Sequence, residues 1–411
     1  MIKNKSYKSF NKSFLSERVK KISPSLTLLL TAKAAALKKQ GVSVVGFTAG
    51  EPDFDTPQHI KDAAKFALDK GYTKYSNNTG LLELRQAIAE KLKQENDLEY
   101  LPQNVMVSCG GKHTLINLFL AALNKGDEVI LPSPYWVSYE EQIKIAQGKV
   151  VLAPLDTSNG LQFKADLVED KITKKTKMIV LNSPQNPTGA VIARKELQKI
   201  ADLAIEHNLL VLSDEVYEHF IYDQDEEYKH KSIASLNDEI KKLTITMNSF
   251  SKTYAMTGWR LGYCAAESEL INAMDALQSH MTSNPTTFAQ YGAIAALTMK
   301  QESQQFVQKM MQEFRKRRDV MVKRLQECEN IDCSIPKGAF YAFPKISNCK
   351  FNGKKLSGTR FSELLLEEQK VAVVPGIAFG DDHYVRLSYA TSMEQIEEGM
   401  DRFEKFCKGL Q

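Results

Sequence analysis

The stretch that decides the fold is Ser249-Phe250-Ser251-Lys252-Thr253-Tyr254-Ala255-Met256-Thr257-Gly258-Trp259-Arg260-Leu261-Gly262. Apolar runs at residues 243–247 and 260–265 lie on either side of it, and both patterns predict strands. Lys252 is therefore expected in a loop at the end of a strand, among hydroxyl-bearing and small residues. A lysine in such a place can be desolvated, which lowers the pKa of its amine and frees it to attack a carbonyl group. Ser249 and Arg260, a neutral donor and a fixed cation, would suit a phosphate.

A lysine in a loop is usually solvated, so Lys252 alone does not indicate a functional site. Polar residues at the ends of the other predicted strands provide further evidence. Asp214 follows the apolar run at residues 209–212 almost directly. Open α/β sheets bind ligands at the carboxyl ends of their strands, and a carboxylate there could hold a heterocyclic nitrogen protonated. The residues alone leave a second interpretation equally open, in which Ser213 or Asp214 is an ordinary helix N-cap.

Two further strand ends carry polar groups. Gly110 and Gly111 open a predicted helix, whose free N–H groups and positive dipole end would attract an anion. Lys112 lies in the first turn of that helix, where a cation opposes the dipole and needs another reason to be present. Asn186 follows the run at residues 178–181 in a rigid Asn-Pro turn. Its amide could bond a ring oxygen or a carboxylate, although the turn by itself is weak evidence.

The alternation of apolar strands with helical stretches such as residues 194–207 predicts the fold class. Several strands are nearly continuous apolar runs, which is typical of a parallel sheet covered on both faces. We expect a large α/β domain with a doubly wound, mostly parallel or mixed sheet, and a smaller α+β domain after it. The predicted strands of the large domain are residues 105–108, 128–131, 149–152, 178–181, 209–212, 243–247 and 260–265.

The two ends of the chain predict the remaining elements. Residues 16–40 are expected to form one helix with a capped start at Ser23-Pro24-Ser25, and residues 42–47 a strand. A long charged helix is expected over residues 300–329, and its Arg315-Lys316-Arg317-Arg318 run is interpreted as a solvated face. Strands of the smaller domain are expected at residues 338–343, 371–374 and 385–388.

Composition and charge exclude several classes of protein. The 411 residues carry 54 Lys+Arg against 50 Asp+Glu, a net charge of +4, and Lys3, Lys5, Lys8 and Lys12 precede the first acid, so the rest sums to zero. That distribution gives no nucleic-acid footprint. The six scattered cysteines form no metal-binding or disulfide pattern, and no apolar run reaches bilayer length. We expect a soluble, cytoplasmic protein with no metal and no membrane segment.

Taken together and in this order, the four segments resemble a class I pyridoxal-phosphate-dependent aminotransferase of the aspartate aminotransferase fold type. The lysine segment fits the family pattern throughout, with small, apolar and small residues before Lys252 and an arginine eight positions after it. The resemblance covers residues 17–407 and includes the termini, through Gly50-Glu51-Pro52-Asp53-Phe54 and Pro375-Gly376-Ile377-Ala378-Phe379-Gly380. It implies the fold type I architecture and pyridoxal 5'-phosphate as the cofactor.

The resemblance also implies a role for each matching residue. Lys252 would form the Schiff base with the cofactor aldehyde and carry the proton at the substrate Cα. Asp214 would pair with the pyridine N–H⁺ and so keep the ring an electron sink. The remaining cofactor contacts would be Tyr217 and Asn186 on the ring oxygen, Gly111, Lys112 (through its backbone N–H), Ser249 and Arg260 on the phosphate, and Trp136 against the ring face.

Substrate recognition is expected at both ends of an amino acid. Arg386, between Val385 and Leu387, would bind the α-carboxylate bidentately, and Gly50 would let the backbone approach it. In the bacterial-type branch with a Gly-Gly-Lys turn, residues matching Lys112 and Thr27 contact the substrate side chain. Both are present here, which favours a dicarboxylic substrate and leaves prephenate open as an alternative. Trp136 and Asn186 would also line the substrate site.

The same resemblance predicts a homodimer with shared active sites, in which Tyr75 reaches the cofactor phosphate of the neighbouring subunit. It predicts a discontinuous small domain (17–58 and 310–411) and a large cofactor-binding domain (59–309). The Lys- and Ser-rich composition of residues 1–16 predicts a flexible basic tail, with an organellar presequence as the alternative. The leading hypothesis is ping-pong transfer of the amino group from L-aspartate to 2-oxoglutarate. A glutamate- or aspartate-prephenate aminotransferase and a β-eliminating C–S lyase of the same fold are the alternatives, and a cofactor-sensing domain of a transcription regulator is the non-enzymatic one.

Overall fold

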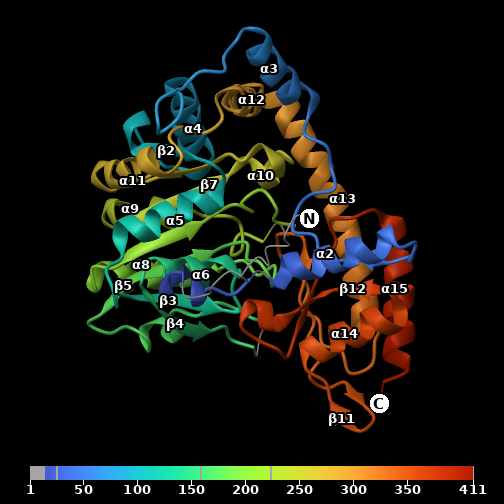
Figure 1. Cartoon of the computed structure of the whole chain (residues 1–411). Helices are drawn as coiled ribbons and strands as arrows, with labels where there is room; N and C mark the ends of the chain where they lie inside the picture. Colours follow the sequence, from blue (N-terminus) through green and yellow to red (C-terminus); the bar gives the residue numbers. More distant parts are fainter. Residues whose placement is uncertain (1–13, 25, 158–159, 223–224, 411) are drawn as a thin grey trace, which may run out of the picture.

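The computed structural model describes residues 14–24, 26–157, 160–222 and 225–410 (Figure 1). Its centre is a seven-stranded sheet in the order β2-β8-β7-β6-β5-β3-β4. Strands β7, β6, β5, β3 and β4 are parallel to one another, and only β8 runs antiparallel to its two neighbours. Each of the seven strands predicted for the large domain is confirmed. Their bounds are β2 (Val105–Ser108), β3 (Glu128–Ser133), β4 (Lys149–Pro154), β5 (Thr176–Asn182), β6 (Leu210–Asp214), β7 (Thr244–Ser249) and β8 (Gly262–Ala265).

Helices cover both faces of this sheet, as continuous apolar strands require. On strand β3, Ile130 packs in one hydrophobic cluster with Ile200 of α8, whereas Val129 packs in another with Leu115 of α5. Because neighbouring residues of a strand point to opposite faces, the two clusters lie on opposite sides of the sheet. The helices around it are α3 (Gln58–Asp69), α4 (Leu82–Asn96), α5 (Gly111–Ala122), α6 (Ser138–Ile145), α7 (Ala165–Glu169), α8 (Arg194–Glu206), α9 (Asp238–Leu243), α10 (Phe250–Thr253), α11 (Ser268–Met281) and α12 (Thr287–Thr298).

Segments from the two ends of the chain lie side by side in the remaining part of the molecule (Figure 1). Strand β1 (Val45–Gly46) pairs in parallel with β12 (Val371–Ala372), and β13 (Val374–Pro375), β14 (Val385–Ser388) and β9 (Tyr341–Ala342) form an antiparallel sheet. This pairing agrees with a discontinuous small domain, whose bounds stay a prediction. The helices of this part are α2 (Leu26–Lys39), α13 (Lys300–Gln326), α14 (Gly358–Gln369) and α15 (Met393–Lys408).

The N-terminal helix differs from its prediction. Residues 16–40 form two helices, α1 (Glu17–Lys20) and α2, instead of one. Pro24 explains the break, because a proline disfavours helical backbone in the residue before it. The predicted cap at Ser25 and residues 1–13 of the predicted tail lie outside the described residues. The expected strands at 42–47 and 338–343 are each only two residues long.

The interpretation of residues 315–318 as a solvated face is wrong for two of the four. Arg317 is buried and its Nη1 lies 2.7 Å from Asp53 Oδ1, while the buried Arg318 donates to the carbonyl oxygen of Pro336 at 3.1 Å. These arginines therefore tie α13 to loops on either side of it. A run of basic residues on a helix does not show by itself that two of them pair with segments distant in the sequence.

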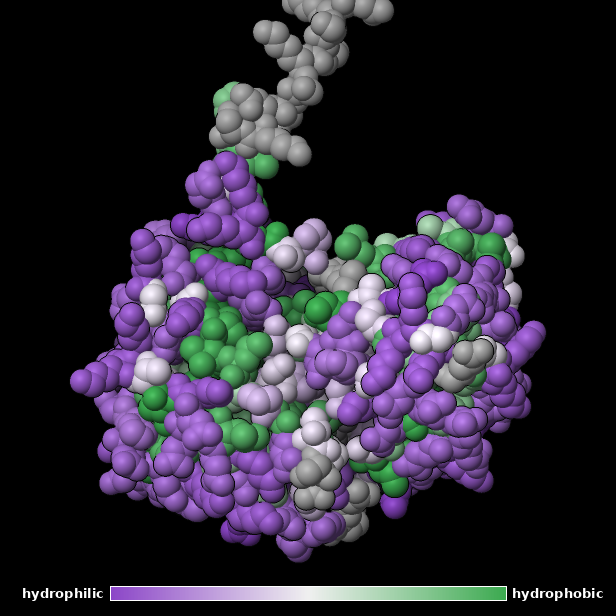
Figure 2. All heavy atoms as spheres, turned by 90° about the horizontal axis from the view of Figure 1, so that it is seen from below, coloured by the Kyte–Doolittle hydropathy of each residue, from purple (hydrophilic) through white to green (hydrophobic). Residues whose placement is uncertain are grey.

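The surface shows no membrane-spanning element in the part of the chain that the structure describes: none of its helices is both long and apolar enough to cross a bilayer. Hydrophilic side chains cover most of the underside of the molecule, and apolar side chains gather in patches toward its middle (Figure 2).

Candidate active site

A cavity of about 420 Å³ opens at the carboxyl ends of the parallel strands, where β5, β6 and β7 end. Residues from α2 and the segment at 48–51 close it on one side, and β14 contributes Arg386. The structure brings all but one of the predicted site residues to this cavity. They are Thr27, Gly50, Gly111, Lys112, Trp136, Asn186, Asp214, Tyr217, Ser249, Lys252, Arg260 and Arg386.

Lys252 lies in the one-turn helix α10, which Ser249 caps by accepting a hydrogen bond from the Ser251 N–H at 3.1 Å. The predicted loop is thus a short helix, because a serine at the end of β7 starts a turn at once. The Lys252 ammonium donates to the carbonyl oxygen of Gly50. Burial lowers the pKa of the Lys252 amine to about 8, and the nearby arginines Arg386 and Arg260 act in the same direction. Such an amine is partly unprotonated near neutral pH and can act as nucleophile and base.

Asp214 ends strand β6 and is buried. Its Oδ2 accepts a hydrogen bond from Tyr139 Oη at 2.5 Å, and its Oδ1 accepts one from the Val216 N–H at 3.2 Å. Burial raises the pKa of this carboxyl group to about 6, and these two hydrogen bonds oppose the rise. The carboxylate is therefore held ionised at an energetic cost, which a cationic partner in the cavity would reduce.

An anion cradle forms where α5 begins beside Arg260. Gly110 has a φ of +87°, a left-handed backbone conformation that favours glycine, and the Arg260 guanidinium lies directly against it. Arg260 itself has a φ of 57°, and β8 starts only at Gly262, so the strand predicted from residue 260 begins two residues later. The helix N-terminus, the Ser249 hydroxyl and the guanidinium together suit a phosphate group.

A second cationic group, Arg386, lies on β14 and is 3% exposed. Its Nη1 donates to Asn186 Oδ1 at 2.9 Å and its Nη2 donates to the Thr48 carbonyl oxygen at 3.0 Å. Its Nε has no hydrogen-bond partner among the described residues. Leaving the buried Nε–H without an acceptor costs free energy. A carboxylate bound in this cavity could accept a hydrogen bond from it and from the rest of the guanidinium.

The comparisons with known proteins agree with this geometry. The family model of class I and II aminotransferases matches residues 42–403. The chain belongs to this aminotransferase family. A relative in Aquifex aeolicus, a "probable aspartate/prephenate aminotransferase", is 49% identical over 95% of this chain and 98% of its own. The aspartate aminotransferase of Bacillus subtilis is 45% identical over 96% of this chain and 99% of its own.

Solved aminotransferase structures share the whole fold. The aspartate aminotransferase from Thermus thermophilus with maleate has a TM-score of 0.90 at 43% identity and covers 95% of this chain and 99% of its own. That of Rhizobium meliloti has a TM-score of 0.91 at 39% identity and covers 97% of this chain and 99% of its own. The predicted family and the fold type I class are therefore confirmed.

The aminotransferase cavity also contains Lys112, whose Nζ lies 5.2 Å from the centroid of the Trp136 ring. Partial burial lowers the pKa of Lys112, and Arg260 adds to this effect. Helix α2 places Thr27 on the same cavity, and Thr31 of that helix donates to the Thr48 hydroxyl at 3.0 Å. Lys112 and Arg386 thus add two cations to this cavity beside Lys252 and Arg260.

Tyr75 is the predicted site residue that this chain does not bring to the cavity. Its exposed fraction is 92%, which agrees with a side chain that reaches another molecule but does not test it. Among the cavity residues that the sequence reasoning missed are Tyr139, whose hydroxyl donates to Asp214, and Tyr341, whose hydroxyl lies 2.7 Å from that of Tyr217. Both act across more than 70 residues of chain, and no local motif marks such pairs.

Proposed function

We propose that this aminotransferase converts L-aspartate and 2-oxoglutarate to oxaloacetate and L-glutamate with pyridoxal 5'-phosphate. The observation that carries the proposal is one cavity with a low-pKa lysine, a buried acid, an anion cradle and two separate cations. Relatives named as aspartate aminotransferases at 45–46% identity support the substrate.

The residues present fit pyridoxal phosphate. The cradle of Gly111, Ser249 and Arg260 suits its phosphate, and the costly ionised state of Asp214 suits a protonated ring nitrogen. Tyr217 and Asn186 would hold the phenolic oxygen. Trp136 would cover the ring face. When bound, the cofactor supplies an electron sink for the negative charge that develops at the substrate Cα.

The side chains of the cavity have separate proposed roles in proton transfer and in substrate binding. With the cofactor bound, Lys252 would take the proton from the substrate Cα and hold it for return, a role that suits a buried amine whose pKa is lowered to about 8. Asp214 would hold the proton of the ring nitrogen in place. Arg386 binds the α-carboxylate, and Lys112 with Thr27 binds the distal carboxylate of aspartate or 2-oxoglutarate.

Arg386→Ala is expected to lower kcat/KM about 10³-fold for every amino acid donor, mostly through KM. The reason is the loss of two charge-assisted hydrogen bonds, each worth about 1.5–3 kcal/mol, to a carboxylate that all donors share. Steady-state kinetics with aspartate and alanine measure this. A defect confined to dicarboxylic donors would mean that Arg386 binds the distal carboxylate instead.

Lys112→Met is expected to act selectively. Aspartate and 2-oxoglutarate should lose about 10–100-fold in kcat/KM, because one charged partner of the side-chain carboxylate is removed. Alanine, which has no such carboxylate, should change by less than about threefold. Equal losses for aspartate and alanine in the same assay would contradict a distal role for Lys112.

We also propose a cytoplasmic homodimer in which the exposed Tyr75 completes the partner's phosphate site. The large exposed side chains Tyr72, Tyr75, Leu82 and Met281 support an interface. We propose the domain division 17–58 with 310–411 against 59–309, which the pairing of β1 with β12 supports.

A panel of amino donors and oxo-acid acceptors, with prephenate among the acceptors, tests the substrate assignment. Aspartate and 2-oxoglutarate should give the highest kcat/KM. Prephenate is the second candidate, because relatives at 42–49% identity are named as probable aspartate/prephenate aminotransferases. A preference for monocarboxylic donors, or release of ammonia without an acceptor, would overturn the proposal.

A further inference from the structure

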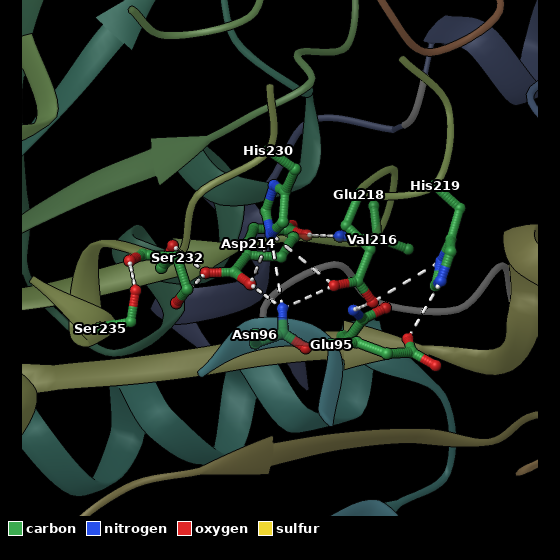
Figure 3. A network of polar contacts seen from close by, with 12 residues as sticks. Glu95, Asn96, Asp214, Val216, Glu218, His219, His230, Ser232 and Ser235 are labelled. Atoms are coloured by element: carbon green, nitrogen blue, oxygen red, sulfur yellow. Dashed lines mark hydrogen bonds and ion pairs between the residues drawn. The ribbon is translucent and has the colours of Figure 1, made fainter. Parts of the chain in front are cut away.

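A buried polar network lies directly behind the site-bearing strand ends (Figure 3). We call it the Glu218 network, and its members come from α4, from the segment after β6 and from β7. Their side chains are largely buried: the exposed fraction is 4% for Lys91, 5% for Glu218 and 2% for Glu215. The network consists of Lys91, Asn96, Glu215, Glu218, His230 and Asn248.

Glu218 is the centre of this network. Its Oε1 accepts hydrogen bonds from the Lys91 ammonium and from Asn248 Nδ2, the latter at 2.5 Å. Its Oε2 accepts one from Asn96 Nδ2 at 2.7 Å. Asn96 in turn accepts from Lys91 Nζ at 2.7 Å and donates to Glu215 Oε2 at 3.2 Å. The carboxylate therefore holds two distant segments in one fixed arrangement.

Three residues of the network are direct sequence neighbours of residues that line the cavity. Glu218 follows Tyr217, and Glu215 follows Asp214. Asn248 precedes Ser249, and its Oδ1 accepts the Ser249 N–H at 2.7 Å. Adjacent residues of a strand face opposite ways, so Ser249 lines the cavity while Asn248 is fixed from behind it.

A metal site and a purely stabilising role are two simpler explanations of the Glu218 network, and each explains less of it. Glu215, Glu218 and His230 are metal-ligand types grouped together, but the Lys91 ammonium already lies against Glu218 as its cation. Stability alone is also a weak reason, since a buried ion pair is often no more stabilising than apolar side chains of the same volume. What the pair adds is a specific geometry between the end of β7 and the segment after β6.

We propose that Glu218 is a positioning residue that acts through Asn248 to fix Ser249, and with it the phosphate side of the cofactor site. Lys91 and Asn96 hold Glu218 in place. The inference rests on the proposed function, because it assumes that the cradle at Ser249 binds pyridoxal phosphate. Within the described part of the chain, none of the printed hydrogen bonds of the network reaches Arg386 or Lys112, to which the proposed function assigns the substrate carboxylates, so its effect should fall on the cofactor and on turnover.

The test uses Asn248→Ala, which removes the link to Ser249 and leaves the Lys91–Glu218 pair intact. The dissociation constant of pyridoxal phosphate from the cofactor-free protein should rise about 10-fold or more, as loss of a supporting hydrogen bond around a site commonly produces. In the loaded enzyme kcat should fall by a similar factor, and KM for aspartate should change by less than about threefold. Fluorescence titration and steady-state kinetics give the two readouts.

Asn117→Ala is the matched control. Asn117 is fully buried and donates to Gln278 Oε1 at 3.0 Å, outside the cavity, so the same substitution should leave cofactor affinity unchanged. Glu218→Gln is the second variant and should weaken cofactor binding at least as much as Asn248→Ala. If Asn248→Ala lowers Tm but keeps wild-type affinity and kcat, the inference is wrong. If the wild-type protein itself neither binds pyridoxal phosphate nor transaminates, the proposed function fails instead.

Discussion

Lys252→Ala should abolish transamination, with a loss in kcat of about 10⁴-fold or more. Removing a general base alone costs up to about 10⁴-fold, and this substitution also removes the amine that joins the cofactor. Among the described residues that line the cavity, the other lysine is Lys112, and its Nζ lies beside the Trp136 ring, so it cannot readily take the place of Lys252. Assays of oxaloacetate release with saturating aspartate measure the loss.

The cofactor should still bind to the Lys252→Ala protein through the phosphate cradle, without the absorbance that a bound Schiff base gives. Lys323→Ala, a change at an exposed position of α13, is the control and should keep wild-type turnover. Normal turnover of Lys252→Ala would contradict the assignment of the catalytic amine.

Asp214→Asn should have two opposite effects. Activity should fall by about 10³-fold or more, because an amide cannot hold a proton on the ring nitrogen by charge. The cofactor-free protein should nevertheless become more stable at pH 8. Burial raises the pKa of the Asp214 carboxyl from its ordinary 3.8 to about 6, so the ionised form costs roughly 3 kcal/mol in the folded state.

The pH dependence of this gain follows from the sign of the shift. With a raised pKa, the folded state binds the proton more tightly than the unfolded state, so wild-type stability falls as the pH rises from about 4 to about 6. Asparagine does not titrate. The variant should therefore gain about 2 kcal/mol above pH 6, after the loss of about 1 kcal/mol of hydrogen bonding, and show no gain at pH 4. Urea unfolding at the two pH values measures this, and a stability gain at pH 4 as large as at pH 8 would contradict it.

The sequence predicts the central sheet well for a physical reason. Its strands are buried on both faces, so the runs at 105–107 and 178–181 are apolar throughout, and the structure has strands at those positions. The small part is predicted less well, because β1 and β9 are two-residue strands whose pairing depends on distant partners. The prediction of one helix over residues 16–40 treats Pro24 as part of a cap, whereas a proline also disfavours helical backbone in the residue before it.

The site shows the same limit. Lys252, Asp214 and Arg386 could be found from the sequence, because each follows or lies within an apolar strand and matches a family motif. Tyr139 could not be found, since it reaches Asp214 from 75 residues away, and Lys91 meets Glu218 from 127 residues away. The sequence does not distinguish a tyrosine or lysine that has such a partner from the other tyrosines and lysines on amphipathic helices. The predicted roles of the cavity residues stay predictions until variants are measured.

The central claim is amino-group transfer in two separate halves, and one single-turnover measurement tests it. The cofactor-loaded protein is mixed with L-aspartate and no acceptor, and oxaloacetate, ammonia and the absorbance of the cofactor are followed. The account predicts one oxaloacetate per active site, no free ammonia, and recovery of the starting spectrum with one glutamate formed when 2-oxoglutarate is added. Continuous release of ammonia without an acceptor, or no oxaloacetate at all, would contradict it.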